Sequence, residues 1–149
     1  MVKLLACGFL LLLSSCSLSE GLGEFSDSIS KEEHQLDQAE SAYNQKLYAL
    51  SRDEFQKFRT KFPASYFSNY AQLKYADSLW YLGNYEEALG AYDQFIADNP
   101  TNEAVVYAEV KAVHCLLKAY RGEERDQTPL EKASKRLERM KIRYPQSFY

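Results

Sequence analysis

Apolar and polar positions alternate with the period of an α-helix from about Glu32 onward, and the pattern occurs in repeats that each end at a proline. Five and eight residues before each proline lies a large apolar or aromatic residue, and twelve residues before it lies a small one. Large side chains on adjacent turns predict a buried helix face, and the small residue allows a second helix to approach closely. Each helix should end at its proline, which excludes the preceding residue from the α region. In sequence order, the aligned residues are Ser51, Phe55, Phe58 and Pro63; Ala88, Tyr92, Phe95 and Pro100; and Ala133, Leu137, Met140 and Pro145.

The segments upstream of these helices also align, at the 37-residue spacing that separates Pro63 from Pro100. Each repeat therefore contains a helix A, a short turn and a helix B, and a period in the thirties is typical of helical-hairpin solenoids. We predict an all-α, tetratricopeptide-like solenoid of about three repeats, at approximately 32–64, 65–101 and 102–149. The aligned helix A pairs include Tyr70 with Tyr107, Lys74 with Lys111, and, one repeat earlier, Tyr43 with Trp80.

Turn and capping residues predict where the B helices begin. Gly83 marks a turn, and Asn84 after it predicts a capped start for the second helix B. Thr128 before Pro129, with Glu131 three residues on, predicts a capping box at the start of the third. The third repeat is longer than the second by a charged insertion between Tyr120 and Thr128, either a solvated loop or a contact site.

Composition narrows the class of protein. The chain of 149 residues is 46% apolar, which predicts one folded domain and excludes general disorder. A net charge of −3 gives no indication of binding to nucleic acid or to an anionic membrane surface. Six glycines and four prolines are too few for a turn-rich all-β fold.

The N-terminus predicts a lipoprotein signal peptide at residues 1–15. Lys3 precedes an apolar run from Leu4 to Leu13, which is too short to span a bilayer. The run ends in Leu13-Ser14-Ser15-Cys16, which resembles the bacterial lipobox. Cys16 is then the lipidation site, acylated by diacylglyceryl and palmitate chains that together give stable anchoring. The alternative is an ordinary secretory signal that contains a cysteine.

Residues 16–31 are rich in Ser, Gly and acidic side chains and predict a lipidated, flexible tether ahead of a repeat domain at 32–149. With Cys7 removed with the signal and Cys16 lipidated, Cys115 is left without an internal disulfide partner. Its apolar neighbours predict a small buried side chain.

No catalytic arrangement is found in the sequence. His34 and His114 are its two histidines, and His114 and Cys115 point about 100° apart on a helix, so they cannot bind one metal ion together. There is no glycine-rich phosphate loop. We therefore expect a protein that is not an enzyme and has no metal or cofactor beyond the covalent lipid on Cys16.

Helix A residues not used for packing predict a binding surface on the concave side of the solenoid. Such a surface combines rigid aromatic area with cations, and it suits a peptide that ends in an aromatic residue and a free carboxylate. The alternative is that Trp80 and Tyr70 simply pack between repeats. The predicted peptide-binding residues are Tyr70, Lys74, Asp77, Trp80, Tyr81, Tyr107 and Lys111.

Several stretches resemble a known family. LGNYEEALGAYDQFIADNP is similar to the second half of a tetratricopeptide repeat. Together with the lipobox, the acidic tether and RDQTPLEKASKRLERMKIRYPQSFY, the chain from about Glu32 resembles the BamD family, also called YfiO or ComL. The RDQTP stretch is the most specific of these features.

The resemblance implies a non-catalytic scaffold that is lipid-anchored at the periplasmic face of the outer membrane. Its implied partners are a BamA-like barrel assembly subunit, other assembly lipoproteins and unfolded outer-membrane proteins. Family members usually carry about five repeats, and three are expected here, so the substrate-binding role of the N-terminal repeats is the one that maps onto this chain. The alternative is a generic repeat lipoprotein, either pilotin-like or an envelope spacer, that serves another machine.

Overall fold

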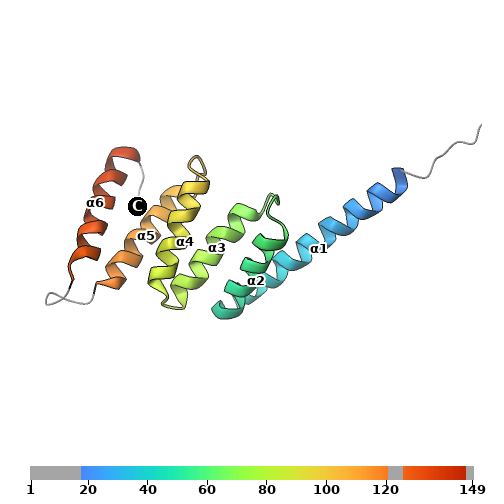
Figure 1. Cartoon of the computed structure of the whole chain (residues 1–149), viewed down its shortest axis with the longest axis horizontal. Coiled ribbons are helices and arrows are strands. Elements are labelled where there is room, and N and C mark those ends of the chain that lie inside the picture. The colour runs from blue at the N-terminus through green and yellow to red at the C-terminus, as the bar shows by residue number, and fades with distance from the viewer. Residues whose placement is uncertain (1–17, 121–125, 147–149) are drawn as a thin grey trace, which may run out of the picture. The chain divides into compact units, whose positions relative to one another are not determined.

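The computed structural model describes residues 18–120 and 126–146, with side chains from residue 30 onward, and these residues form six α-helices and no strand (Figure 1). The prediction of an all-α fold with about three helical hairpins is confirmed. The expected signal peptide and Cys16 lie outside the described residues. The helices are α1 (Leu18–Asn44), α2 (Tyr48–Lys61), α3 (Ser68–Tyr81), α4 (Tyr85–Asp98), α5 (Val105–Ala119) and α6 (Thr128–Arg143).

The chain divides into two compact units, Met1–Lys31 and Glu32–Tyr149. Helix α1 begins at Leu18, so the expectation of a non-helical tether was wrong for the described part of residues 16–31. The apolar residues Leu18, Leu22, Phe25 and Ile29 recur at intervals of three and four, which is helical spacing that the Ser and Gly content obscured. Within the described residues, no helix combines the length and apolar character needed to cross a membrane.

Consecutive helices pack on one another from α2 to α6. The three B helices, α2, α4 and α6, each end two residues before a proline, as predicted. Their C-cap residues share one backbone conformation: Phe62 has φ −127° and ψ 59°, Asn99 has −130° and 53°, and Tyr144 has −129° and 59°. Because proline excludes the preceding residue from the α region, the chain turns out of the B helix in the same way in each repeat.

Small residues mark the closest approach between helices. Ser51, Ala88 and Ala133 are 0%, 0% and 1% exposed, which confirms the interpretation of these positions. Ser51 Oγ lies 3.0 Å from Ser78 Oγ, so a buried hydrogen bond joins α2 to α3. At the matching junction of α4 with α5, Ala88 and Cys115 belong to one apolar cluster.

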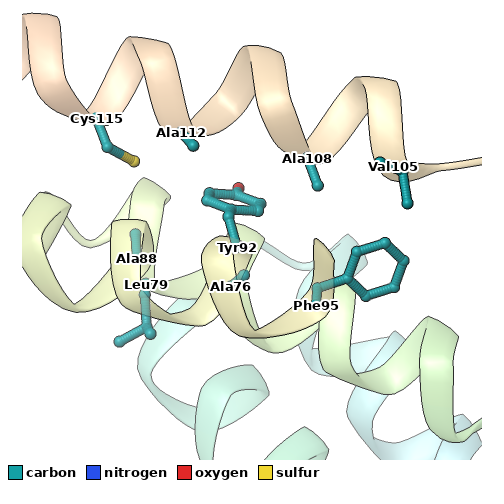
Figure 2. Packing of buried hydrophobic residues seen from close by; sticks show 9 residues of the cluster. All are labelled: Ala76, Leu79, Ala88, Tyr92, Phe95, Val105, Ala108, Ala112 and Cys115. Atoms are coloured by element: carbon teal, nitrogen blue, oxygen red, sulfur yellow. The ribbon is translucent and has the colours of Figure 1, made fainter. Parts of the chain in front are cut away.

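The largest apolar cluster lies among α3, α4 and α5 (Figure 2). Tyr92 of α4 points toward α5, where Ala108 and Ala112 leave room for its ring. Cys115 is 1% exposed, as predicted, and burial raises the pKa of its thiol to about 12. The thiol therefore stays protonated at neutral pH and acts as a small apolar side chain.

The large residues of the B helices are buried in the first two repeats and only partly in the third. Phe55 and Tyr92 are fully buried beneath α3 and α5 respectively, whereas the aligned Leu137 is 42% exposed. The apolar face predicted for the B helices is therefore only partly covered in α6. No described helix covers Leu137 in the way that α5 covers Tyr92.

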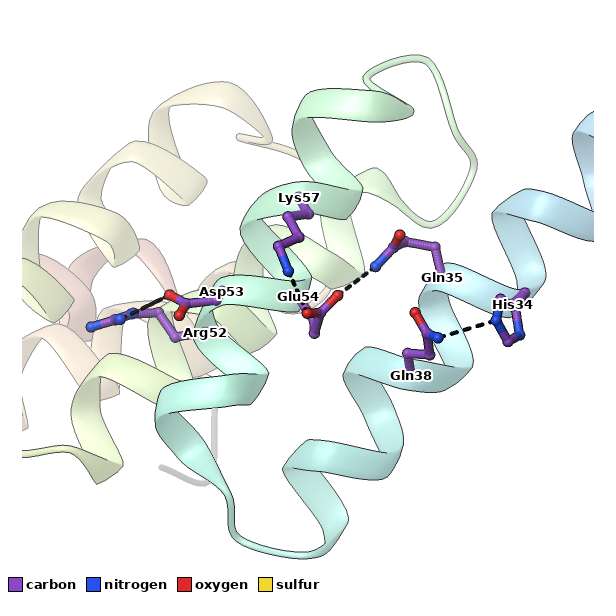
Figure 3. A network of polar contacts seen from close by, with 7 residues as sticks. All are labelled: His34, Gln35, Gln38, Arg52, Asp53, Glu54 and Lys57. Atoms are coloured by element: carbon purple, nitrogen blue, oxygen red, sulfur yellow. Dashed lines mark hydrogen bonds and ion pairs between the residues drawn. The ribbon is translucent and has the colours of Figure 1, made fainter.

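Polar contacts join the end of α1 to α2 (Figure 3). Gln35 Nε2 donates to Glu54 Oε2 at 2.6 Å, and Lys57 Nζ donates to Glu54 Oε1 at 2.6 Å. The glutamate thus binds one donor on each helix. Beneath this contact Leu36 and Ala39 of α1 pack against Phe55.

The predicted capping interactions did not form. Asn84 occupies the cap position of α4, but its side chain makes no capping hydrogen bond. Helix α6 begins at Thr128 with Gln127 at the cap, and Asp126 Oδ1 accepts a hydrogen bond from the Thr128 amide at 2.9 Å. A turn closed by the side chain of Asp126, two residues before the expected cap, thus replaces the expected capping box.

Two turns between helices A and B place a residue in the left-handed region. Gly83 has φ 81°, and Lys46, which is 37 residues earlier, has φ 61°. In both turns the next amide reaches back five residues: Asn84 N bonds Leu79 O, and Leu47 N bonds Ala42 O. This is the helix C-terminal geometry that favours glycine.

Substitutions of the two left-handed residues, Lys46 and Gly83, should have opposite effects on stability. Lys46→Gly should raise the free energy of unfolding by about 0.5 kcal/mol, because it relieves a left-handed non-glycine residue at some cost in unfolded-state entropy. Gly83→Ala should lower it by about 1 kcal/mol. The added methyl group would meet no atom within 4 Å, so the loss comes from the backbone alone. Urea unfolding of both variants checks this, and changes of the same sign would contradict it.

Candidate peptide-binding surface

The predicted site residues lie together on the A helices. Helices α1, α3 and α5 each contribute aromatic rings, and α3 and α5 each contribute a lysine between them. We call this set the aromatic–lysine ladder. It comprises Tyr43, Tyr70, Lys74, Trp80, Tyr81, Tyr107 and Lys111, together with Tyr48 at the start of α2.

Lys74 lies between rings of two successive A helices. Its Nζ is 4.4 Å from the centroid of Tyr43 on α1 and 5.6 Å from that of Tyr70, one turn back on α3. Asp77 Oδ2 lies 3.9 Å from this nitrogen, beyond hydrogen-bond distance. The ammonium is therefore held mainly by ring faces, each worth about 0.5–2 kcal/mol according to solvent exposure.

Lys111 repeats this arrangement one repeat later. Its Nζ is 4.0 Å from the centroid of Trp80 on α3 and 5.5 Å from that of Tyr107 on α5. A third ring, Tyr81, lies at 5.5 Å. Each lysine thus contacts a ring 31 positions earlier and a ring four positions earlier, so the ladder follows the repeat of the sequence.

The exposed part of the ladder is aromatic. Tyr81 is 46% exposed and Tyr70 is 39% exposed. Tyr81 stacks on Tyr48 with centroids 4.4 Å apart and an interplanar angle of 9°, and Tyr43 meets it edge-on. Burial, with the charge of Glu40 as the next cause, raises the pKa of Tyr70 to about 12. The contacts between Tyr43, Tyr48 and Tyr81 hold these rings in place, which keeps the entropic cost of binding low.

Asp77 differs from the other predicted residues. Its side chain is 2% exposed, so the expectation that it lies on the surface was wrong. Asp77 Oδ1 accepts hydrogen bonds from Tyr92 of α4 at 2.6 Å and from Tyr107 of α5 at 2.8 Å. A carboxylate on α3 therefore connects three helices beneath the ladder.

The tyrosines around this carboxylate remain hydrogen-bond donors. Burial, and then the negative charge of Asp77, raise the pKa values of Tyr43, Tyr92 and Tyr107 above the usual range. Both causes disfavour the phenolate. Since Tyr92 and Tyr107 stay protonated, they can bond Asp77 at any physiological pH.

Trp80 packs against the apolar core and also belongs to the aromatic–lysine ladder. Its ring lies against Tyr85 and belongs to the margin of the main apolar cluster, while Lys111 lies over its face. Its Nε1 is buried without a hydrogen-bond partner among the described residues. The alternative of packing between repeats thus holds in part for Trp80, whereas Tyr70 keeps more than a third of its surface exposed.

Sequence reasoning missed two members of the surface. Tyr43 aligns with Trp80 at the 37-residue spacing, which was the available signal. Tyr48 belongs to a B helix and joins the surface only through its stack on Tyr81, which no spacing shows. Among the described residues, no group of three or more His, Cys, Asp or Glu side chains could hold a metal ion.

The consecutive helical hairpins define a tetratricopeptide-like repeat protein, and its A helices carry an aromatic and cationic surface. Residues 30–149 match the model of the YfiO family, described as outer membrane lipoproteins. The chain belongs to this family, which is also known as BamD and is not known to be catalytic. A search of curated proteins gives no match.

The position of Asp77 yields a stability prediction. Asp77→Ala should lower the free energy of unfolding by about 3 kcal/mol, because two tyrosine hydroxyls lose their acceptor at roughly 1–3 kcal/mol for a buried group. Asp77→Asn keeps an acceptor oxygen and should cost about 1 kcal/mol. Urea unfolding measures both, with Asp53→Ala as the exposed control. A loss for Asp77→Ala no larger than for Asp53→Ala would contradict the assignment.

Proposed function

We propose that the chain is a non-catalytic scaffold of the outer-membrane protein assembly machine. It binds a BamA-like barrel assembly subunit, other assembly lipoproteins and unfolded β-barrel substrates on the periplasmic side. Membership of a family of outer-membrane lipoproteins supports this setting.

The observation that carries the substrate-binding role is the pairing of exposed rings with ring-held lysines. Tyr70 and Tyr81 offer aromatic area, and Lys74 and Lys111 add positive charge next to it. For Lys111 the described residues provide three ring contacts and no ion pair. Its ammonium can therefore donate to a ligand carboxylate without breaking an existing salt bridge.

The ligand that fits is the C-terminal segment of an unfolded outer-membrane protein, with an aromatic last residue. The aromatic ring lies against Tyr70 or Tyr81, and the terminal carboxylate approaches Lys74 or Lys111. Preformed rings lower the entropic cost of ordering such a peptide. Asp77 is buried and has no direct part in this contact.

Photo-crosslinking tests this proposal. A benzoylphenylalanine at Tyr70 should capture an unfolded outer-membrane protein several-fold more efficiently than one at Tyr66, which is 91% exposed but outside the ladder. Lys111→Gln should weaken binding of a peptide with a free C-terminus by about three- to tenfold and leave its amidated form unaffected. Equal capture at both tyrosines would overturn the proposal.

We further propose that Cys16 carries the lipid that anchors the protein in the outer membrane. The lipobox sequence supports this assignment. Cys16→Ser should remain unprocessed and incorporate no radiolabelled palmitate, while Cys115→Ser, which changes a buried thiol, should label like the wild type. Equal labelling of Cys16→Ser and wild type would refute it.

A further inference from the structure

Two equivalent grooves run between successive B helices, outside the aromatic–lysine ladder. The first lies among α2, α3 and α4 and has a volume of about 340 Å³. The second lies among α4, α5 and α6, where two hollows of about 730 and 350 Å³ share Asp93, Arg136 and Arg139 and so form one continuous groove. The residues that line them correspond through the repeat: Gln56 with Asp93, Gln72 with Glu109, Glu87 with Lys132, Ala91 with Arg136, and Gln94 with Arg139.

The two grooves differ in charge, although the repeats place them alike. Along its outer side, α4 carries two acidic and no basic residues at four positions, whereas α6 carries four basic residues at the aligned positions. Packing between repeats therefore does not require cations at these four positions, since the first groove, which Arg59 of α2 lines, forms with none of them. The aligned pairs are Glu87 with Lys132, Gly90 with Lys135, Gln94 with Arg139, and Asp98 with Arg143.

The acids of the second groove already have partners. Arg136, whose side chain is 11% exposed, binds Asp93 Oδ1 at 2.6 Å and Glu109 Oε2, and so joins α6 to α4 and α5. Glu138 binds Lys141 at 2.9 Å. The exposed Lys135 and Arg139 have no recorded carboxylate contact in the part of the chain that the structure describes. The groove therefore has an excess of positive charge.

A second feature distinguishes this groove. Beside the first groove, the C-cap residue Asn99 donates from Nδ2 to Oε1 of the lining residue Gln72 at 3.2 Å. In the second, the aligned C-cap residue is Tyr144, which lines the 350 Å³ hollow. Its hydroxyl is buried and has no hydrogen-bond partner among the described residues. A ligand oxygen that reached this hydroxyl would supply the missing acceptor.

We propose that the groove among α4, α5 and α6 binds an acidic, extended segment of a partner protein. Lys135, Arg139 and Arg143 follow one another at four-residue intervals, about 6 Å apart along the helix. Side chains on alternate residues of an extended peptide are about 6.7 Å apart. A segment with an acidic residue at every second position thus matches the row of cations.

The remaining features of the groove fit the same ligand. Leu89 and Leu116 form an apolar floor for the side chains between the acids. An oxygen of the segment can accept a hydrogen bond from Tyr144, and Arg143, 5.5 Å from that ring, lies beside it. A membrane surface would meet the outer cations but could not follow a groove floored by Leu89 and Leu116, so we assign the groove to a peptide.

Fluorescence anisotropy with a labelled peptide of alternating Glu and Val tests this proposal on the full chain. The peptide should bind, should release on addition of salt, and should bind more tightly than the same peptide with Gln in place of Glu. Arg139→Gln with Arg143→Gln should raise its Kd at least about tenfold. The matched control is Lys57→Gln with Lys61→Gln, which removes two cations at the aligned positions of α2 and should leave Kd unchanged.

Tyr144→Phe distinguishes peptide binding within the hollow from general electrostatic attraction to the cations. This change removes only the unpaired hydroxyl, so it should weaken the peptide several-fold without lowering the melting temperature. Equal Kd values for the α2 and α6 double variants would overturn the proposal, as would equal affinity for the Glu and Gln peptides. Phosphatidylglycerol vesicles that bind in an α6-dependent manner, while the peptide does not bind, would assign the groove to a membrane and overturn it as well.

Discussion

The carboxylate of Asp77 is the constraint on which the rest of the repeat structure depends. A buried carboxylate is unfavourable unless its charge is compensated, and here two tyrosine hydroxyls donate to it and the ammonium of Lys74 lies 3.9 Å away. These partners come from three helices, so the relative placement of α3, α4 and α5 is fixed by directed bonds in addition to apolar contact. Tyr107 also contributes its ring to Lys111, and Lys74 contacts Tyr43. The core and the exposed ladder are thus parts of one network.

The sequence predicted the features that arise from local rules. Proline set the ends of the B helices, and spacing along one helix identified buried faces such as that of Phe55 and Phe58. It could not predict the burial of Asp77, because the tyrosines that surround it are 15 and 30 residues away on other helices. The partial exposure of Leu137 has the same origin: burial depends on the neighbouring helix, which the residue's own helix pattern does not describe.

The repeats share a backbone while their surfaces have diverged. The C-cap geometry is the same at Phe62, Asn99 and Tyr144. Their side chains differ: Phe62 is a ring, Asn99 is an amide donor, and Tyr144 has a hydroxyl with no partner among the described residues. On the A helices cations are paired with aromatic rings, whereas along α6 they stand in a row beside a groove. One scaffold can therefore present two chemically distinct surfaces, because the residues that stack the repeats are different from those that face solvent.

The junction between Ser51 and Ser78 has a consequence for the order in which the repeats assemble. Ser78 donates to the carbonyl of Lys74, so Ser51 donates to Ser78. The next junction places alanine against Cys115. If the first B helix docked against α5 instead of α3, its hydroxyl would face a thiol, a far weaker acceptor, at a cost of up to about 1–3 kcal/mol. The hydrogen bond between Ser51 and Ser78 thus favours the pairing of α2 with α3 and disfavours exchange of repeats within the chain or between chains.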